Sequence, residues 1–129
     1  MSQVAAELLY SKEHEWVQVL SETKVKVGIS DFAQSELGDI VFVDLPEPGA
    51  DVVANQSMGT IESVKAVSNI FSPVSGKIIE MNPVLADSPE TINSDPYSEG
   101  WLAVIQLSHP DELKELMSSD QYAGFVKEE

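Results

Sequence analysis

The chain of 129 residues contains no cysteine and no arginine, and it has only two histidines. Without cysteine it cannot form a disulfide framework, a thiolate metal site or a cysteine nucleophile. It also has no paired-histidine metal motif, no glycine-rich phosphate loop and no Gly-x-Ser-x-Gly elbow. No apolar run approaches the length of a membrane span, and the N-terminus has neither a signal-peptide nor a transit-peptide pattern. The sequence is therefore poor in the patterns of an enzyme, and we expect an intracellular protein.

Negative charge dominates the composition of the chain. Aspartate and glutamate number 22 against 7 basic residues, which gives a formal net charge of −15. Such a surface repels phosphate backbones and anionic membranes, so both are poor partner candidates. Protein partners with basic docking faces are plausible, with association that weakens in salt. The same charge could instead serve solubility alone.

Length and composition predict one domain over residues 1–129. An apolar fraction of 43% is near the globular average and argues against disorder. Alternating apolar and polar residues over 16–20 and 24–29 predict a two-stranded hairpin. The second strand should direct three side chains to the core, namely Val25, Val27 and Ile29. The two lysines between them, Lys24 and Lys26, should face water.

Further strands are predicted by short runs of β-formers that are bounded by turn residues. They cover 39–45, 51–54, 57–62, 66–71, 77–81 and 101–107. In the first of these runs, apolar residues occupy both the odd-numbered and the even-numbered positions. This pattern is typical of a strand that is buried on both faces of a sheet.

Helices are predicted to be short. One covers 31–37, with Ser30 as N-cap and Gly38 just past its end. Another begins with Ser88 as N-cap and Pro89 at the first helical position. Two C-terminal helices, opened by Pro110 and Ser119, carry apolar stripes that should pack on the sheet. The two histidines, His14 and His109, are expected to be solvated rather than catalytic.

One lysine stands out by its position. Lys65 lies between the predicted strands 57–62 and 66–71, which places it at the tip of a hairpin. A lone ammonium group on a flexible stem, carried on a stiff turn, suits attachment of a cofactor by an amide bond. The alternative is an ordinary surface lysine at a solvated turn.

Several motifs occur in order along the chain, and one of them surrounds this lysine. They read YSKEHEW at 10–16, VGISDFAQ at 27–34, LGDIVFVDLP at 37–46, IESVKAVS at 61–68, SPVSG at 72–76, DSP at 87–89, NSDPY at 93–97 and GW at 100–101. With these motifs the chain resembles the H proteins of the glycine cleavage system over nearly its whole length. The resemblance implies a mainly β fold: a flattened barrel of two antiparallel sheets, the barrel-sandwich hybrid of lipoyl and biotinyl carriers, with short peripheral helices.

The resemblance also implies site residues. Lys65 would carry lipoic acid covalently, and lipoylating enzymes would read its surroundings, namely Glu62, Ser63, Val64, Ala66 and Gly76. A biotinyl carrier would have methionines on both sides of the lysine. A groove for the loaded arm would include Glu13, Glu15, Phe32 and Asn69. Many relatives have histidine in place of Phe32 and aspartate in place of Asn69. The alternative for Glu13 and Glu15 is a solvated acidic segment.

By the same resemblance the chain is a carrier and no enzyme itself. Its implied partners are a pyridoxal-phosphate glycine decarboxylase, an aminomethyltransferase, dihydrolipoamide dehydrogenase and a lipoyl ligase or octanoyltransferase. A monomer in the bacterial cytoplasm is expected, with a mature mitochondrial form left open. Two alternatives stand: a lipoyl relay to 2-oxoacid dehydrogenases, and a non-lipoylated acidic adaptor on the same scaffold.

Overall fold

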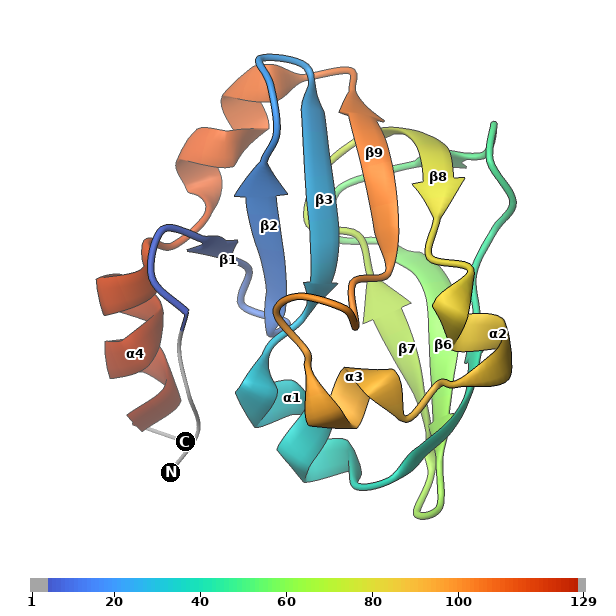
Figure 1. Cartoon of the computed structure of the whole chain (residues 1–129). Coiled ribbons are helices and arrows are strands. Elements are labelled where there is room, and N and C mark those ends of the chain that lie inside the picture. The colour runs from blue at the N-terminus through green and yellow to red at the C-terminus, as the bar shows by residue number, and fades with distance from the viewer. Residues whose placement is uncertain (1–4, 128–129) are drawn as a thin grey trace.

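The computed structural model describes residues 5–127 and is mainly β, with two antiparallel sheets and a few short helices (Figure 1). The six-stranded sheet has the order β1 (Leu9–Tyr10), β2 (Glu15–Val19), β3 (Lys24–Ile29), β9 (Ala103–Leu107), β8 (Gly76–Met81) and β5 (Asp51–Val52). The three-stranded sheet has the order β4 (Ile40–Asp44), β6 (Ser57–Ser63) and β7 (Val67–Phe71). The predicted fold class is confirmed.

The main core contains buried side chains from both sheets. Val25, Val27 and Ile29 are buried in it, as their alternation predicts. Lys24 is exposed, but Lys26 is only half exposed, and its Nζ lies 5.3 Å from the centre of the Trp101 ring. Lys26 thus lies on the face away from the core, as predicted, but it is partly covered there by an aromatic ring that attracts its ammonium group.

Strand β4 differs from its prediction. The apolar run around it indicates burial on both faces, yet Val41 and Phe42 are both exposed. A β-bulge between Ile40 and Phe42 shifts the register against β6 and adds Val41 to the strand. Because a bulge interrupts the alternation of side chains, two successive apolar residues can face solvent.

The first helix forms as predicted. Helix α1 spans Asp31–Leu37, and the Ser30 hydroxyl caps it by accepting a hydrogen bond from the Ala33 N–H at 3.2 Å. Gly38 follows with φ of 81°, and its N–H donates to the Gln34 carbonyl at 3.0 Å. This left-handed backbone conformation favours glycine and turns the chain into β4.

The second helical region is predicted only in part. Two short helices form there, α2 (Val84–Asp87) and α3 (Thr91–Ser94). Ser88 ends α2, where its N–H donates to the Val84 carbonyl at 2.8 Å, and it is not the N-cap of the next helix. Its carbonyl accepts the Thr91 N–H at 3.0 Å, and Glu90 is the N-cap of α3. The Asn82 side chain accepts the Val84 N–H at 3.2 Å, so α2 begins earlier than the Ser-Pro pair indicates.

At the C-terminus, Pro110 opens a 3₁₀ helix, η1 (Pro110–Glu115), and Ser119 opens α4 (Ser119–Lys127). Helix α4 lies beside β1 at one side of the six-stranded sheet (Figure 1). There Tyr122 packs in a second cluster with Tyr10 and Trp16, and its ring stacks on Tyr10 with centroids 4.2 Å apart. Among the described residues, no helix combines the length and the apolar character that crossing a membrane requires.

Candidate functional site

Lys65 lies in the exposed turn between β6 and β7, which projects at one end of the molecule (Figure 1). Ser63 organises this turn, because its hydroxyl oxygen accepts hydrogen bonds from the N–H groups of Lys65 and Ala66, each at 3.2 Å. The Ser63 N–H in turn donates to the Ala66 carbonyl at 2.8 Å. The backbone that presents the lysine is therefore fixed by local hydrogen bonds.

The turn is also tied to the start of β4. The Val64 N–H donates to the Asp39 carbonyl at 3.0 Å. A side chain at Gly38 would place its Cβ 3.5 Å from Cε of Lys65, so the lysine stem lies over this glycine. The lysine is thus positioned by the junction between α1 and β4 as well as by its own hairpin.

Asn93 of α3 holds that junction in place. Its side-chain N–H₂ group donates to the Gly38 carbonyl at 2.8 Å and to Oε1 of Gln34 at 2.9 Å. Its side-chain oxygen accepts the Ile40 N–H at 2.9 Å. One amide therefore links α1, the glycine beneath Lys65 and the first residue of β4.

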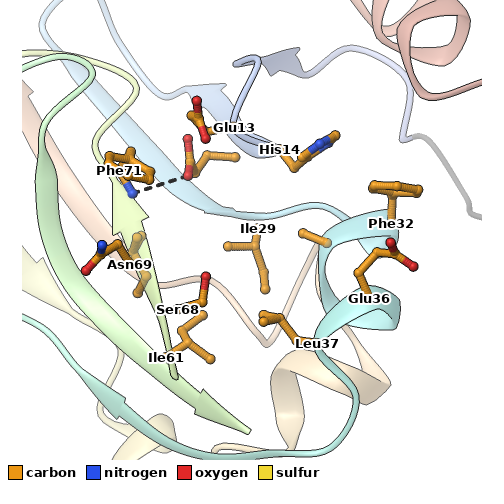
Figure 2. A pocket seen from close by; sticks show the side chains of 13 residues that line it. Glu13, His14, Ile29, Phe32, Glu36, Leu37, Ile61, Ser68, Asn69 and Phe71 are labelled. Carbon is orange, nitrogen blue, oxygen red and sulfur yellow. Dashed lines mark hydrogen bonds between the residues drawn. The ribbon is translucent and has the colours of Figure 1, made fainter. Parts of the chain in front are cut away.

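A groove lies between α1, β7 and the segment before β2, with a volume of about 540 Å³ (Figure 2). Its lining residues are Glu13, His14, Glu15, Ile29, Phe32, Ala33, Glu36, Leu37, Ile61, Ser68, Asn69, Ile70 and Phe71. All four residues expected from the resemblance are among them: Glu13, Glu15, Phe32 and Asn69. Leu37 precedes the glycine beneath the lysine stem, so the groove reaches close to Lys65.

Glu15 is a buried carboxyl in the wall of this groove, with only 3% of its surface exposed. Oε1 accepts a hydrogen bond from the Ser11 hydroxyl at 2.6 Å, and Oε2 accepts one from the Phe71 N–H at 3.3 Å. Burial raises the pKa of Glu15 to about 8; these two hydrogen bonds oppose the shift, and the Glu13 carboxylate adds to it. The alternative of a solvated acidic segment is wrong for Glu15, whereas Glu13 is exposed.

His14 is not the solvated side chain that we expect from the sequence. Its Nδ1 lies 2.7 Å from the Tyr122 hydroxyl, and its ring centroid lies 4.8 Å from that of Phe32. The Tyr122 hydroxyl is also 2.7 Å from the hydroxyl of Ser30, the N-cap of α1. The C-terminal helix therefore helps to hold one rim of the groove. His109 is exposed, as expected.

The structure brings together most of the expected recognition positions but not Gly76. Glu62, Ser63, Val64 and Ala66 all lie in the Lys65 hairpin. Gly76 pairs with Leu107 at the end of β9, which lies at the opposite end of the molecule from the β6–β7 turn (Figure 1). A Cβ at Gly76 would overlap the Gln106 carbonyl oxygen, so close packing of the backbone requires this glycine.

Sequence reasoning missed several groove residues, notably Glu36, Leu37, Ser68 and Phe71. The predicted helix over 31–37 contains the first two, but nothing in its pattern indicates which strand it faces. Within residues 5–127, no group of three or more histidine, aspartate or glutamate side chains is arranged to hold a metal ion. The described part of the chain thus offers a presented lysine and a groove.

The two-sheet sandwich, with its lysine on a rigid turn between strands, defines a carrier protein of the barrel-sandwich class. Comparison with known proteins narrows the class. The family described as Glycine cleavage H-protein matches residues 8–129.

Individual relatives agree with this match. The chain is 56% identical over 121 residues to the glycine cleavage system H protein of Coprothermobacter proteolyticus. The aligned region covers 94% of this chain and 95% of the relative. It is 52% identical over 129 residues to that of Halalkalibacterium halodurans, with both chains fully covered. The crystal structure of an H protein from Mycobacterium marinum superposes with a TM-score of 0.89 at 39% identity and covers 96% of this chain and 99% of the other. The chain belongs to the glycine cleavage H-protein family, which supports a lipoyl carrier role in glycine cleavage.

Proposed function

We propose that Lys65 is the residue that carries lipoic acid, in amide linkage, and that the chain serves as the mobile-arm carrier of glycine cleavage. The observation that carries this proposal is the exposure of Lys65 on a turn fixed by Ser63. The surroundings fit such an arm, because the lysine stem lies over Gly38 and the groove is lined by Leu37, the residue before that glycine. A bulkier residue beneath the stem would restrict the movement of the arm.

Lys65 would hold the lipoyl group, which would supply a disulfide–dithiol pair. That pair would provide the chemistry for carrying an aminomethyl group from a glycine decarboxylase to a folate-dependent aminomethyltransferase, with dihydrolipoamide dehydrogenase restoring the disulfide. The protein's own contribution is to position and to shield. A tethered arm meets each partner at a high effective concentration, which the reach of the tether limits.

The groove residues have distinct proposed roles. Glu15 and Glu13 accept hydrogen bonds from a cationic amine, and a cation close to Glu15 favours its ionised form in spite of burial. Asn69 contributes a neutral amide in place of the expected aspartate, so it can accept a hydrogen bond without adding charge. Phe32, against the His14 ring, supplies an apolar wall that excludes water.

The remaining assignments rest on the same family membership. Glu62, Ser63, Val64 and Ala66 are proposed to be read by the lipoylating enzyme because they adjoin the lysine. The proposed location is the bacterial cytoplasm, as the relatives come from bacteria. The chain is proposed to act as a monomeric single-domain carrier and not as a catalyst.

The test is glycine–bicarbonate exchange with glycine decarboxylase, measured with lipoylated wild type, Lys65→Arg and Lys77→Arg. Arginine keeps the positive charge but is not acylated by the ligase, so Lys65→Arg should give no exchange above background. Lys77 is an exposed lysine on β8, and its replacement should leave exchange unchanged. Exchange at the wild-type rate by Lys65→Arg would refute the proposal.

A further inference from the structure

Tyr122 of helix α4 is a fully buried side chain whose hydroxyl reaches two elements of the groove at once. The hydroxyl lies 2.7 Å from Nδ1 of His14 and 2.7 Å from Oγ of Ser30. The segment that contains His14 also brings Glu13 and Glu15 into the groove. Ser30 is the N-cap of α1, which forms another wall. One hydroxyl of the C-terminal helix therefore bridges two walls of the groove.

The backbone at His14 adopts a conformation that needs support from its surroundings. Its φ is 70°, in the left-handed region that residues with a Cβ rarely occupy. The segment closes a tight turn here, because the His14 N–H donates to the Ser11 carbonyl at 3.1 Å and the Ser11 N–H donates to the Glu15 carbonyl at 2.8 Å. A strained conformation of this kind persists only where the neighbouring structure enforces it. Contacts that hold His14 therefore also hold the carboxyl groups on either side of it.

The His14 ring is packed against three aromatic side chains. Its centroid lies 4.8 Å from that of Phe32 on α1, and 5.7 Å from those of Tyr122 and Phe125 on α4. Figure 2 shows His14 beside Phe32 at one end of the groove. Apolar packing has little directional preference, whereas a hydrogen bond has a preferred direction. The bond between Nδ1 and the Tyr122 hydroxyl is thus the contact that fixes the rotation of the ring.

The same hydroxyl also holds the start of α1. Oγ of Ser30 accepts the Ala33 N–H at 3.2 Å, and the Ser30 N–H donates to the His14 carbonyl at 2.9 Å. Helix α1 contributes one wall of the groove and is followed by Gly38, over which the Lys65 stem lies. A shift at the N-cap would therefore move this wall relative to the His14 turn.

We propose that Tyr122 is a positioning residue of the groove, whose hydroxyl keeps the His14 turn and the start of α1 at the separation that encloses the arm on Lys65. This inference rests on the proposed function. Tyr122 is not among the lining residues, so it acts through His14 and Ser30. Its ring stacks on that of Tyr10 with centroids 4.2 Å apart, which holds the hydroxyl in place. The C-terminal helix thus contributes to shielding from outside the groove.

The test compares Tyr122→Phe with Tyr10→Phe, because each variant removes one hydroxyl from the same buried cluster. The Tyr10 hydroxyl donates to the Ala5 carbonyl at 2.7 Å, and neither of these residues lines the groove. Both variants should lose similar stability in urea. A difference between them in the properties of the groove then reports the position of the hydroxyl rather than a general loss of stability.

The first readout is hydrogen exchange of the Phe71 amide in the full, unmodified chain. This N–H donates to Oε2 of Glu15, so its exchange reports whether the His14 turn stays in place. We expect exchange to be about fivefold or more faster in Tyr122→Phe, the factor that one neutral hydrogen bond is typically worth, and unchanged in Tyr10→Phe. Asparagine tolerates a left-handed backbone but has a shorter side chain, so Tyr122→Phe should have a smaller effect when combined with His14→Asn.

The second readout is the shielding of the loaded arm. The lipoylated chain is loaded with glycine and glycine decarboxylase, the decarboxylase is removed, and the ammonia that the chain then releases is followed over time. Release from Tyr122→Phe should be about fivefold or more faster than from Tyr10→Phe, because a displaced wall admits water. Lipoylation of the two variants should proceed at the same rate, since the Lys65 turn is fixed by its own hydrogen bonds to Ser63.

The outcomes separate this inference from the proposed function. If wild type is loaded and Tyr122→Phe behaves as Tyr10→Phe in both readouts, the positioning role is refuted while the carrier role stands. Faster exchange of the Phe71 amide with unchanged release of ammonia would show that Tyr122 holds the turn without shielding the arm, and would overturn the proposal. If wild type itself remains unmodified by a lipoate ligase, both proposals fail.

Discussion

The buried carboxyl of Glu15 accepts a hydrogen bond from the backbone N–H of Phe71 over 3.3 Å and so joins the six-stranded sheet to the three-stranded sheet (Figure 2). Both residues line the groove, and the Ser11 hydroxyl holds the second carboxyl oxygen. One side chain is therefore a structural link between sheets and a polar group inside the groove.

The burial of Glu15 makes stability depend on pH. Because the pKa of Glu15 is raised to about 8, the folded chain retains a proton that the unfolded chain releases above its ordinary pKa near 4.5. The contribution of Glu15 to stability therefore falls as pH rises from about 4.5 to about 8, by up to about 1.4 kcal/mol per pH unit. Urea unfolding of wild type and Glu15→Gln across this range checks the slope, which should be smaller in the variant.

Glu13→Gln is the matched control, since this exposed acid lies two residues away in the same groove. It should keep most of the wild-type slope. An equal pH dependence in wild type and Glu15→Gln would show that another group binds the proton.

Gly76 provides a prediction about packing. In Gly76→Ala the new Cβ would overlap the Gln106 carbonyl oxygen, so we expect a loss of about 1–3 kcal/mol or more in the free energy of unfolding. Gly124 in α4 is the control: a Cβ there meets nothing within 4 Å, and alanine should stabilise the helix by up to about 1 kcal/mol. A fully stable Gly76→Ala that the ligase no longer accepts would instead support direct recognition.

Asn93 is expected to control the order of the lysine turn. Asn93→Ala removes the amide that binds Gly38 and Ile40, with an expected cost of about 2–3 kcal/mol because the carbonyl and N–H that it leaves are partly buried. Hydrogen exchange of the Val64 amide should then accelerate, by roughly tenfold for each 1.4 kcal/mol lost locally. Ser94→Ala, an exposed neighbour on α3, should leave that amide protected. Unchanged protection in Asn93→Ala would separate this residue from the turn.

Much of the fold follows from local sequence signals. The hairpin over 16–29, the capped helix after Ser30 and the turn that carries Lys65 are all predicted by alternation, capping residues and turn spacing. These signals act over a few residues and depend little on the rest of the molecule.

The errors arise where distant segments meet. The burial of Glu15 and the contact between His14 and Tyr122, 108 residues apart, depend on how β2, β7 and α4 pack, which no local pattern encodes. The bulge at Val41 leaves this residue and Phe42 exposed, although their apolar run predicts burial on both faces. Four groove residues, Glu13, Glu15, Phe32 and Asn69, are expected from the family resemblance, and the structure adds that they line one cavity together with others that the sequence does not indicate.

The central claim is that Lys65 carries the arm, and the most direct measurement is the intact mass of the chain after incubation with lipoate, ATP and a lipoate ligase, followed by a digest. We predict one lipoyl increment per chain, located on the peptide that contains Lys65 and absent from Lys65→Arg. An unmodified wild-type chain, or an increment on any other lysine, would contradict the account.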